Sequence, residues 1–325
     1  MLIREKSESS KKYGLNPNNR PIDMVLKLGL LNIDKPAGVT SSQVSGWVKQ
    51  MLGARKAGHS GTLDPKVTGV LPIMINSATK VVGVVLESSK KYVGVMHLHS
   101  DVELKQVEKV AKDFVGEISQ RPPVKSAVKR EVRKRTVYFL DVLEMQNKDV
   151  LFNTEVEAGT YIRKLCHDMG EKLGVGAHMS ELRRTKAGPF TEKTSVTMHE
   201  LSEAWNLFKE SGDETLLRKV ILPIEVVVAD LPKIHVKDSA IDSVCNGSRL
   251  GVSGVSTLDE KIKEGDLVAV MSLKGELISL GTALMNGELI VEAWEGDAAT
   301  TNRVIMEKGT YPKIWGRKNA NKRHK

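Results

Sequence analysis

The chain changes character near Leu231-Pro232, and this change constrains its fold more than any other feature. Upstream, apolar runs of strand length alternate with longer stretches that carry apolar residues at helical spacing. Downstream, short β-prone runs are separated by glycines at positions 247, 251, 254, 265, 275, 281 and 287, a pattern typical of strands joined by tight turns. The sequence therefore predicts two units: an α+β unit over residues 30–231 and an all-β unit over residues 232–312.

The α+β unit is expected to contain a mixed, largely antiparallel sheet, because several of its strands are joined by hairpin-like links. Periodicity predicts strands at 29–35, 70–75, 92–99, 137–143 and 151–156, and helices near 41–51, 104–114 and 162–173. Thr40, Ser41 and Ser42 offer N-caps for the first helix. One face of that helix carries Val44, Trp47, Val48 and Met51.

Two segments lie outside these units. Residues 1–29 are polar and contain Asn16-Pro17 and Arg20-Pro21. We therefore expect an extended arm rather than a helix, and such an arm must lean on another part of the fold. Residues 313–325 form a basic tail.

The net charge of +9 is concentrated in basic clusters at 125–135, 183–186 and 317–325. A single charge run is usually a solvated face, but three basic clusters favour a polyanionic partner such as nucleic acid. Because only 4% of the residues are aromatic, phosphate contacts rather than broad base stacking should dominate the affinity.

Several classes of protein are disfavoured. No apolar run approaches the roughly 20 residues that span a bilayer, and no secretory signal is readable, so we expect a cytoplasmic protein with no membrane partner. Cys166 and Cys245 match no metal-ligand spacing. Cys166 lies on the apolar face of its helix, and His97 and His99 share a strand face without a third ligand nearby, so we expect all three to be structural. No metal or cofactor is expected.

One carboxylate stands in a loop of small residues. Gly58, Gly61 and Gly69 permit positive φ and close approach of a ligand, while Pro65 biases Asp64 toward an extended conformation. The loop can present Asp64 to a substrate, although an Asp-Pro surface turn would also explain residues 58–65. A nucleotide-binding phosphate loop is disfavoured because no Gly-Lys-Ser/Thr ending follows.

Three motifs together resemble a known family. They are Gly29-Leu30-Leu31-Asn32-Ile33-Asp34-Lys35-Pro36 with residues 37–41, residues 58–65 with 69–72, and Gly159-Thr160-Tyr161-Ile162-Arg163 with Leu182-Arg183-Arg184. In order and spacing they resemble the pseudouridine synthases that modify the tRNA T-loop. Residues 121–130 and 237–240 are most similar to the archaeal, dyskerin-like branch, the catalytic subunit of box H/ACA ribonucleoproteins. The resemblance runs from about residue 10 to Trp315.

The resemblance implies that the chain isomerises uridine to pseudouridine, cutting the N1–C1′ bond and rejoining the base through C5 without redox change or cofactor. By similarity Asp64 is the catalytic residue and Arg163 is the arginine that pairs with it. We expect this pair to be buried, so that truncating one partner would cost roughly 3 to 5 kcal/mol. Without the motif, Arg163 would be interpreted as a surface residue of an amphipathic helix.

Other pocket residues follow from the same resemblance. Tyr92 matches the tyrosine that stacks on the flipped base, whose extrusion costs a few kcal/mol; a core aromatic is the alternative. His59, Tyr161 and Leu182 match further substrate-pocket positions, although a structural histidine and a core leucine remain open for His59 and Leu182. Lys35 with Pro36 matches a motif that braces the pocket.

The C-terminal unit resembles the PUA RNA-binding domain, and the family suggests that the N-terminal arm lies against it. The expected docking loop is 245–251, where Gly247 allows close backbone approach and Arg249 can pair with a phosphate. Segment 122–136 corresponds to the family's thumb over the substrate. Its expected RNA contacts are Lys125, Lys129 and Arg130.

The implied partners are an H/ACA guide RNA, rRNA and tRNA substrates, and three small core proteins: a zinc-ribbon-like subunit, a glycine-arginine-rich subunit and a kink-turn-binding, ribosomal-protein-like subunit. Three functions stay open: a guide-dependent synthase, a stand-alone tRNA T-loop modifier, and an RNA-binding scaffold with a vestigial site. The PUA unit and the thumb favour the first. The intact Asp64, Tyr92 and Arg163 disfavour the third.

Overall fold

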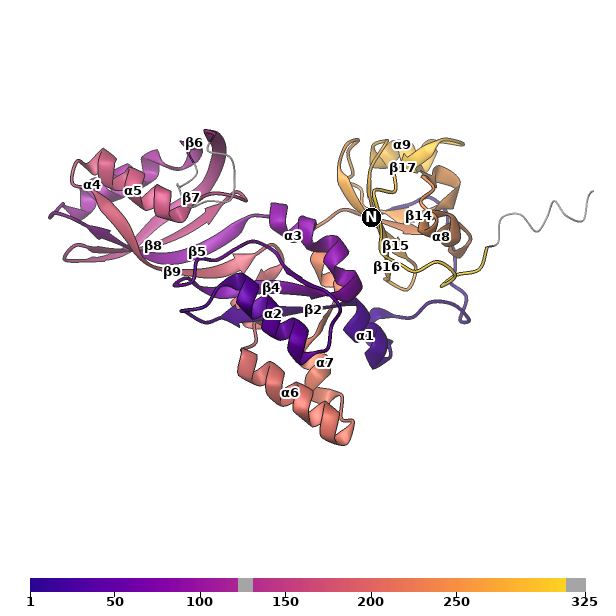
Figure 1. Cartoon of the computed structure of the whole chain (residues 1–325). Coiled ribbons are helices and arrows are strands. Elements are labelled where there is room, and N and C mark those ends of the chain that lie inside the picture. The colour runs from indigo at the N-terminus through magenta and orange to yellow at the C-terminus, as the bar shows by residue number, and fades with distance from the viewer. Residues whose placement is uncertain (122–130, 314–325) are drawn as a thin grey trace, which may run out of the picture. The chain divides into compact units, whose positions relative to one another are not determined.

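The computed structural model describes residues 1–121 and 131–313, and the chain divides into two compact units. One unit is Leu30–Leu222, and the other joins Met1–Gly29 to the chain from Pro223 onward. Figure 1 labels the elements of both. Each unit has its own apolar cluster of buried residues.

The Leu30–Leu222 unit is built on a mixed sheet. The strands follow the order β2 (Gly29–Lys35), β4 (Thr68–Ile75), β9 (Ala177–Ala187), β5 (Lys90–Leu98), β8 (Asp149–Val156), β7 (Arg133–Gln146) and β6 (Gly116–Gln120). Strands β4 and β9 run parallel, and the other neighbours in this order are antiparallel. Two short strands, β3 (Ala57–His59) and β10 (Phe190–Thr191), pair with β4 and β9. The predicted mixed, largely antiparallel sheet is therefore confirmed.

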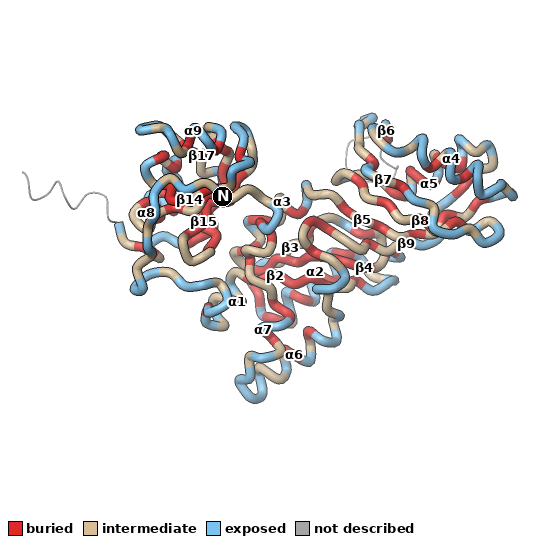
Figure 2. Tube along the Cα trace, turned by 180° about the vertical axis from the view of Figure 1, so that it is seen from behind, coloured by how far each residue is buried: buried red, intermediate tan, exposed pale blue. Residues whose placement is uncertain are grey.

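Helices cover this sheet. They are α2 (Ser41–Met51), α3 (Val82–Glu87), α4 (Leu104–Asp113), α5 (Ile162–Leu173), α6 (Met198–Ser211) and α7 (Thr215–Val220). Helix α2 contacts β3 and β4, whereas α4 and α5 contact each other and pack on β7 and β9, respectively. The resulting burial of β2 and β4 appears in red in Figure 2.

Local sequence explains how α2 begins and which face it buries. The Thr40 side chain accepts a hydrogen bond from Gln43 N, and Gln43 Oε1 in turn accepts one from Thr40 N, a reciprocal cap. Val44 and Val48, one turn apart, are fully buried. Trp47 is 42% exposed, so its predicted place on the buried face is wrong. Its side chain lies at the border of the face that buries Val44 and Val48.

The second unit contains a six-stranded sheet in the order β1 (Leu2–Ile3), β14 (Val255–Leu258), β12 (Lys233–Val236), β15 (Leu267–Ser272), β16 (Leu277–Thr282) and β18 (Arg303–Val304). Strands β13 (Leu250–Gly251) and β17 (Asp297–Ala299) form a separate pair. The prediction of a purely β unit is wrong in one respect, because α8 (Asp238–Cys245) and α9 (Gly287–Glu292) are helices. Helix α8 buries Ala240, Ile241, Val244 and Cys245, which have helical spacing. The helix is so short that its sequence can be mistaken for a strand.

The N-terminal arm belongs to this second unit, as the resemblance suggested. Its strand β1 pairs with β14 through Leu2 and Ile3. The arm is not extended throughout, since Ile22–Leu28 forms α1; this part of the prediction is wrong. Pro21 directly precedes the helix, Asp23 lies in its first turn and Lys27 in its last, which suits both helix ends.

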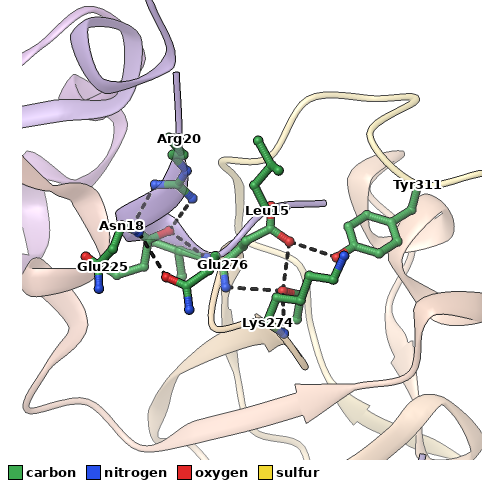
Figure 3. A network of polar contacts seen from close by, with 10 residues as sticks. Leu15, Asn18, Arg20, Glu225, Lys274, Glu276 and Tyr311 are labelled. Carbon is green, nitrogen blue, oxygen red and sulfur yellow. Dashed lines mark hydrogen bonds and ion pairs between the residues drawn. The ribbon is translucent and has the colours of Figure 1, made fainter. Parts of the chain in front are cut away.

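A buried polar network fastens the arm to the sheet (Figure 3). Glu276 is 1% exposed, and its carboxylate accepts hydrogen bonds from Leu15 N at 3.0 Å and from the Tyr311 hydroxyl at 2.8 Å. Arg20 forms a two-point ion pair with Glu225 at 2.9 and 2.7 Å. Gly14 has φ +65°, and a Cβ there would lie 2.0 Å from the Tyr311 oxygen, so the close approach requires glycine.

Candidate active site

The loop that carries Asp64 is held from the β2–α2 connection. Gly38 N donates to Pro65 O at 2.9 Å, and Leu63 N donates to Ser41 Oγ at 2.8 Å. Val67 N closes a turn onto Asp64 O at 3.0 Å. Leu63 and Val67 are each 3% exposed, so apolar anchors on both sides of Asp64 fix its backbone while the carboxylate stays open to solvent.

Arg163 pairs with Asp64 in two places. Its Nε lies 2.8 Å from Oδ2 and its Nη2 donates to Oδ1 at 3.1 Å, the fork geometry that suits a carboxylate. Arg163 lies in the first turn of α5. The side chains are 48% and 43% exposed, respectively, so the expected buried pair is wrong. Helix α5 is amphipathic, and Arg163 lies on its open flank, where a substrate can reach the pair.

Lys35 lies beneath the same loop. The side chain is fully buried, and Nζ donates to the carbonyl oxygens of Pro36 at 2.8 Å, Pro65 at 3.0 Å and Val67 at 2.8 Å. Burial lowers the pKa of Lys35, and the negative charge of Asp64 partly offsets this effect. Asp64 thus has positive charge on two sides, and Lys35 braces the loop as the resemblance implied.

Tyr92 and Leu182 lie behind the loop. Tyr92 is 9% exposed and belongs to the same apolar cluster as Leu63 and Val67, the two anchors of the loop. Leu182 is half-buried against this cluster. The Leu182 side chain packs over Gly94 of β5, where a Cβ would lie 2.8 Å from Leu182 Cδ1. Both residues therefore contribute to the apolar core that also holds the anchors of the Asp64 loop.

Tyr161 and His59 lie close in sequence to Arg163 and Asp64, respectively. Tyr161 is the N-cap of α5, and its backbone N donates to Gln120 Oε1 at 2.9 Å. This bond ties β6 to the turn that carries Arg163. His59, the last residue of β3, is half-buried. Burial and the positive charge of Arg184 lower the pKa of His59, which favours the neutral imidazole at pH 7.

Of the five expected RNA-binding residues, only Gly247 and Arg249 lie within the described part of the chain. Gly247 has φ +90° just after α8, a conformation that favours glycine. Arg249 is exposed, but its Nη1 lies 3.2 Å from Asp297 Oδ2, so a phosphate would compete with that carboxylate. Lys125, Lys129 and Arg130 lie outside the described residues, as does the tail beyond Lys313. Of the thumb segment, Arg133 to Thr136 belong to β7 and pair with β6.

The basic cluster 183–186 does not form the free cationic patch that its charge suggested. Arg183 makes a two-point pair with Asp34 at 2.9 Å and contacts Glu192 at 2.5 Å. Arg184 is 1% exposed. Both side chains serve the fold around the site, so this part of the polyanion argument is corrected.

Sequence reasoning did not single out Lys90 or Arg184 individually. Lys90 is 5% exposed, and Nζ donates to the carbonyl oxygens of Val85, Leu86 and Ser88 at 2.9, 2.6 and 2.5 Å. Burial, assisted by the charge of Arg184, lowers the pKa of Lys90 to about 8. The available sequence signal for Lys90 was its position two residues before Tyr92, because residues at this spacing share one face of a strand. In β5 that face is the buried one.

Cys166, His97 and His99 were expected to be structural residues. Burial raises the pKa of the Cys166 thiol to about 12, consistent with a core residue. His97 contacts Asp149 at 2.7 Å, while His99 contacts His178 at 3.0 Å; the sequence did not reveal the third histidine because it lies on β9. Within residues 1–121 and 131–313, no three His, Cys, Asp or Glu side chains are arranged to hold a metal ion.

The geometry defines a class of protein. A carboxylate paired with a guanidinium lies on a unit built around a mixed sheet, and a second, β-rich unit follows it in the chain. Residues 49–162 match the TruB family pseudouridylate synthase N-terminal domain, and residues 163–229 the tRNA pseudouridylate synthase B C-terminal domain. Residues 232–305 match the PUA domain, and residues 1–45 the DKCLD (NUC011) domain.

Relatives agree over nearly the whole chain. The probable tRNA pseudouridine synthase B of Methanosarcina acetivorans is 54% identical over 94% of this chain and 90% of that protein, and that of Methanopyrus kandleri is 49% identical over 98% and 94%. A solved Cbf5-Nop10-Gar1 complex contains a chain with 49% identity, a TM-score of 0.92 and 96% coverage of each chain. The chain belongs to the TruB family of pseudouridine synthases, isomerases that act on RNA.

A second solved structure, an H/ACA RNP bound to a substrate RNA containing 2′-deoxyuridine, contains a chain with 47% identity and a TM-score of 0.91, covering 97% of this chain and 96% of that one. The predicted fold class, with a PUA domain at its C-terminal end, is confirmed by these matches.

Across the described part of the chain, no helix combines the length and apolarity needed to cross a membrane.

Proposed function

We propose that this pseudouridine synthase uses Asp64 as its essential carboxylate and acts as the catalytic subunit of a box H/ACA ribonucleoprotein. The observation that carries the catalytic assignment is the two-point contact of Arg163 with Asp64 at 2.8 and 3.1 Å. In this arrangement the guanidinium orients the carboxylate and balances its charge, while half of the carboxylate surface stays open to an extruded uridine.

Each neighbour has a role in the proposal. Asp64 acts on the sugar C1′, on the base C6 or as the base that removes a proton, and all three roles need the ionised carboxylate. Tyr92 stacks on the flipped base, so binding recovers part of the cost of unstacking it. His59, Tyr161 and Leu182 border the nucleotide. Lys125, Lys129, Arg130, Gly247 and Arg249 contact RNA.

Guide-RNA dependence is supported by the solved relatives, one from a Cbf5-Nop10-Gar1 complex and one from an H/ACA RNP bound to a substrate RNA. We therefore propose the same kinds of partner: a guide RNA, rRNA and tRNA substrates, and small core proteins. The DKCLD match at residues 1–45 and the PUA match at residues 232–305 support the proposed domains, with an arm at 1–29, a catalytic domain at 30–231 and a PUA domain at 232–312. A cytoplasmic location completes the proposal.

A second candidate is a stand-alone tRNA T-loop synthase, favoured by the names of the curated relatives, which are probable tRNA pseudouridine synthases B. Both candidates share the Asp64 chemistry and differ in what selects the uridine. The test is to incubate the purified chain with tRNA and rRNA fragments, alone and with guide RNA plus core proteins, and to map pseudouridine by sequencing. New sites that follow the guide support the first candidate; T-loop modification by the chain alone supports the second.

A further inference from the structure

Arg184 connects the two sides of the Asp64 loop from below. Its Nε donates to Val70 O at 2.8 Å and its Nη2 to Gly61 O at 3.3 Å. Gly61 precedes Asp64 in the loop, and Val70 follows it in β4. With 1% exposure, the guanidinium cannot contact RNA directly, so any effect on the reaction must pass through the loop.

The backbone around Arg184 is shaped to place it there. Strands β4 and β9 pair Gly69 with Arg184, and a Cβ on Gly69 would lie 2.2 Å from the Arg184 carbonyl oxygen. On the other side, β5 opposes Tyr92 to Arg184 and Lys91 to Lys186, which leaves Thr185 as the extra residue of a β-bulge. Bulges re-aim side chains next to active sites, and this one aims Arg184 between the Asp64 loop and the Tyr92 strand.

The charge of Arg184 is also unusual. In the described ranges no carboxylate forms an ion pair with it, and carbonyl oxygens alone accept its hydrogen bonds. A buried cation in such a place is costly compared with an apolar side chain of similar volume, so packing alone does not account for it. After burial itself, Arg184 is the main cause of the lowered pKa of both His59 and Lys90.

We propose that Arg184 is a positioning residue for the pseudouridine synthase reaction, which fixes the loop that carries Asp64 against the strand that carries Tyr92. Its two donors set the separation of Gly61 and Val70, and hence the direction of the carboxylate. Its charge adds to burial in favouring the neutral form of His59, which then meets the nucleotide as an uncharged hydrogen-bonding group. This inference rests on the proposed role of Asp64.

The test compares Arg184→Met, which keeps an unbranched apolar stem but removes the donors and the charge, with Arg184→Lys, which keeps the charge but not the fork. Arg218→Met, on the exposed side of α7, is the matched control. Three quantities are measured on the full chain: the single-turnover rate of pseudouridine formation, the Kd for substrate RNA, and the pKa of His59 by NMR.

We expect Arg184→Met to lower the rate by about 10- to 100-fold, as misplacement of a catalytic group does, with RNA Kd within about threefold of the wild-type value and a higher pKa for His59. Arg184→Lys should restore the low pKa of His59 but only part of the rate. Arg218→Met should match the wild type in all three. If Arg184→Met does not fold, the rate deficit of Arg184→Lys at unchanged Kd decides the question.

The proposal is overturned if Arg184→Met, or Arg184→Lys where Arg184→Met does not fold, reacts at the wild-type rate, or if the rate and the RNA affinity fall by the same factor. These outcomes are separable from failure of the proposed function. If Asp64→Asn keeps full activity, the Asp64 assignment fails whatever Arg184 does. If Asp64→Asn is inactive while Arg184→Met is fully active, only the positioning role is lost.

Discussion

The ammonium of Lys35 lies directly under the loop of Asp64 and donates to Pro65 O at 3.0 Å and Val67 O at 2.8 Å. Replacing Lys35 by Met would remove the ammonium donor from the buried Val67 carbonyl, at a cost of about 1 to 3 kcal/mol, whereas Pro65 O would keep its bond from Gly38 N. We therefore expect Lys35→Met to lower the melting temperature and the turnover together. Lys66→Met, at an exposed position of the same loop, is the control; equal melting temperatures for the two variants would contradict the bracing role.

Arg163→Ala should affect turnover far more than stability. The pair with Asp64 is about half exposed, and such pairs contribute at most about 1 kcal/mol to stability. Loss of the oriented guanidinium should lower the single-turnover rate by about 100-fold or more. Arg163→Lys should recover only part, because an ammonium cannot match both carboxylate oxygens. A melting temperature that collapses with the rate would argue for a mainly structural pair.

Tyr92 can be tested by separating its ring from its hydroxyl. Tyr92→Phe keeps the buried ring and should retain much of the activity if stacking is its main role. Tyr92→Ala should lower the free energy of unfolding by about 3 to 5 kcal/mol, because the ring packs with the loop anchors Leu63 and Val67. Denaturant titration and single-turnover rates check both variants. Activity lost in Tyr92→Phe would instead assign the chemistry to the hydroxyl.

The arm depends on the Tyr311–Glu276 contact at 2.8 Å. Burial and this hydrogen bond raise the pKa of Tyr311. Tyr311→Phe removes a donor from a buried carboxylate and should cost about 1.5 to 3 kcal/mol. Limited proteolysis at Lys11 and Lys12 should accelerate. Tyr13→Phe, which changes a 38% exposed ring, serves as the control and should leave the cleavage rate unchanged. Equal acceleration in both variants would contradict the role of the Tyr311 hydroxyl in holding the arm.

Lys90 should make stability depend on pH in the alkaline range. Its pKa is about 8 in the folded chain, against 10.5 for an ordinary lysine. Between these values the unfolded chain binds more protons, so this group makes the free energy of unfolding rise with pH, by at most about 1.4 kcal/mol per unit. Below about pH 8 the contribution is constant. The difference between wild type and Lys90→Met, followed by denaturant titration from pH 7 to 10.5, should show this rise; a flat difference would contradict it.

Hydrophobic patterning predicted the sheet well because buried positions leave a pattern in each strand, alternating along β5 and nearly continuous along β2. The run 29–35 appears as β2, with Gly29 and Lys35 as its ends. The helices α8 and α9 were missed since runs of only eight and six residues, respectively, fit a strand as well as a helix. Trp47 was misplaced because an amphipathic stripe does not say how far a large side chain at its edge reaches.

The candidate site was less accessible to the sequence alone. Asp64 and Arg163 are 99 positions apart, and no local pattern links them; only the family resemblance did. The exposure of the two side chains was also not predicted, because a sequence motif does not show how deeply a residue is buried. Arg184 and Lys90 were overlooked because carbonyl oxygens satisfy them, and carbonyl groups are present at every residue and leave no mark in the sequence.

The most direct measurement is the single-turnover rate of pseudouridine formation by Asp64→Asn, assembled with guide RNA and core proteins and compared with wild type and with Asp101→Asn at an exposed position. Asparagine keeps the size of the side chain but can neither ionise nor balance the charge of Arg163. The account predicts no pseudouridine above background for Asp64→Asn, with unchanged RNA affinity and melting temperature, and the wild-type rate for Asp101→Asn. Pseudouridine formed by Asp64→Asn at the wild-type rate would contradict it.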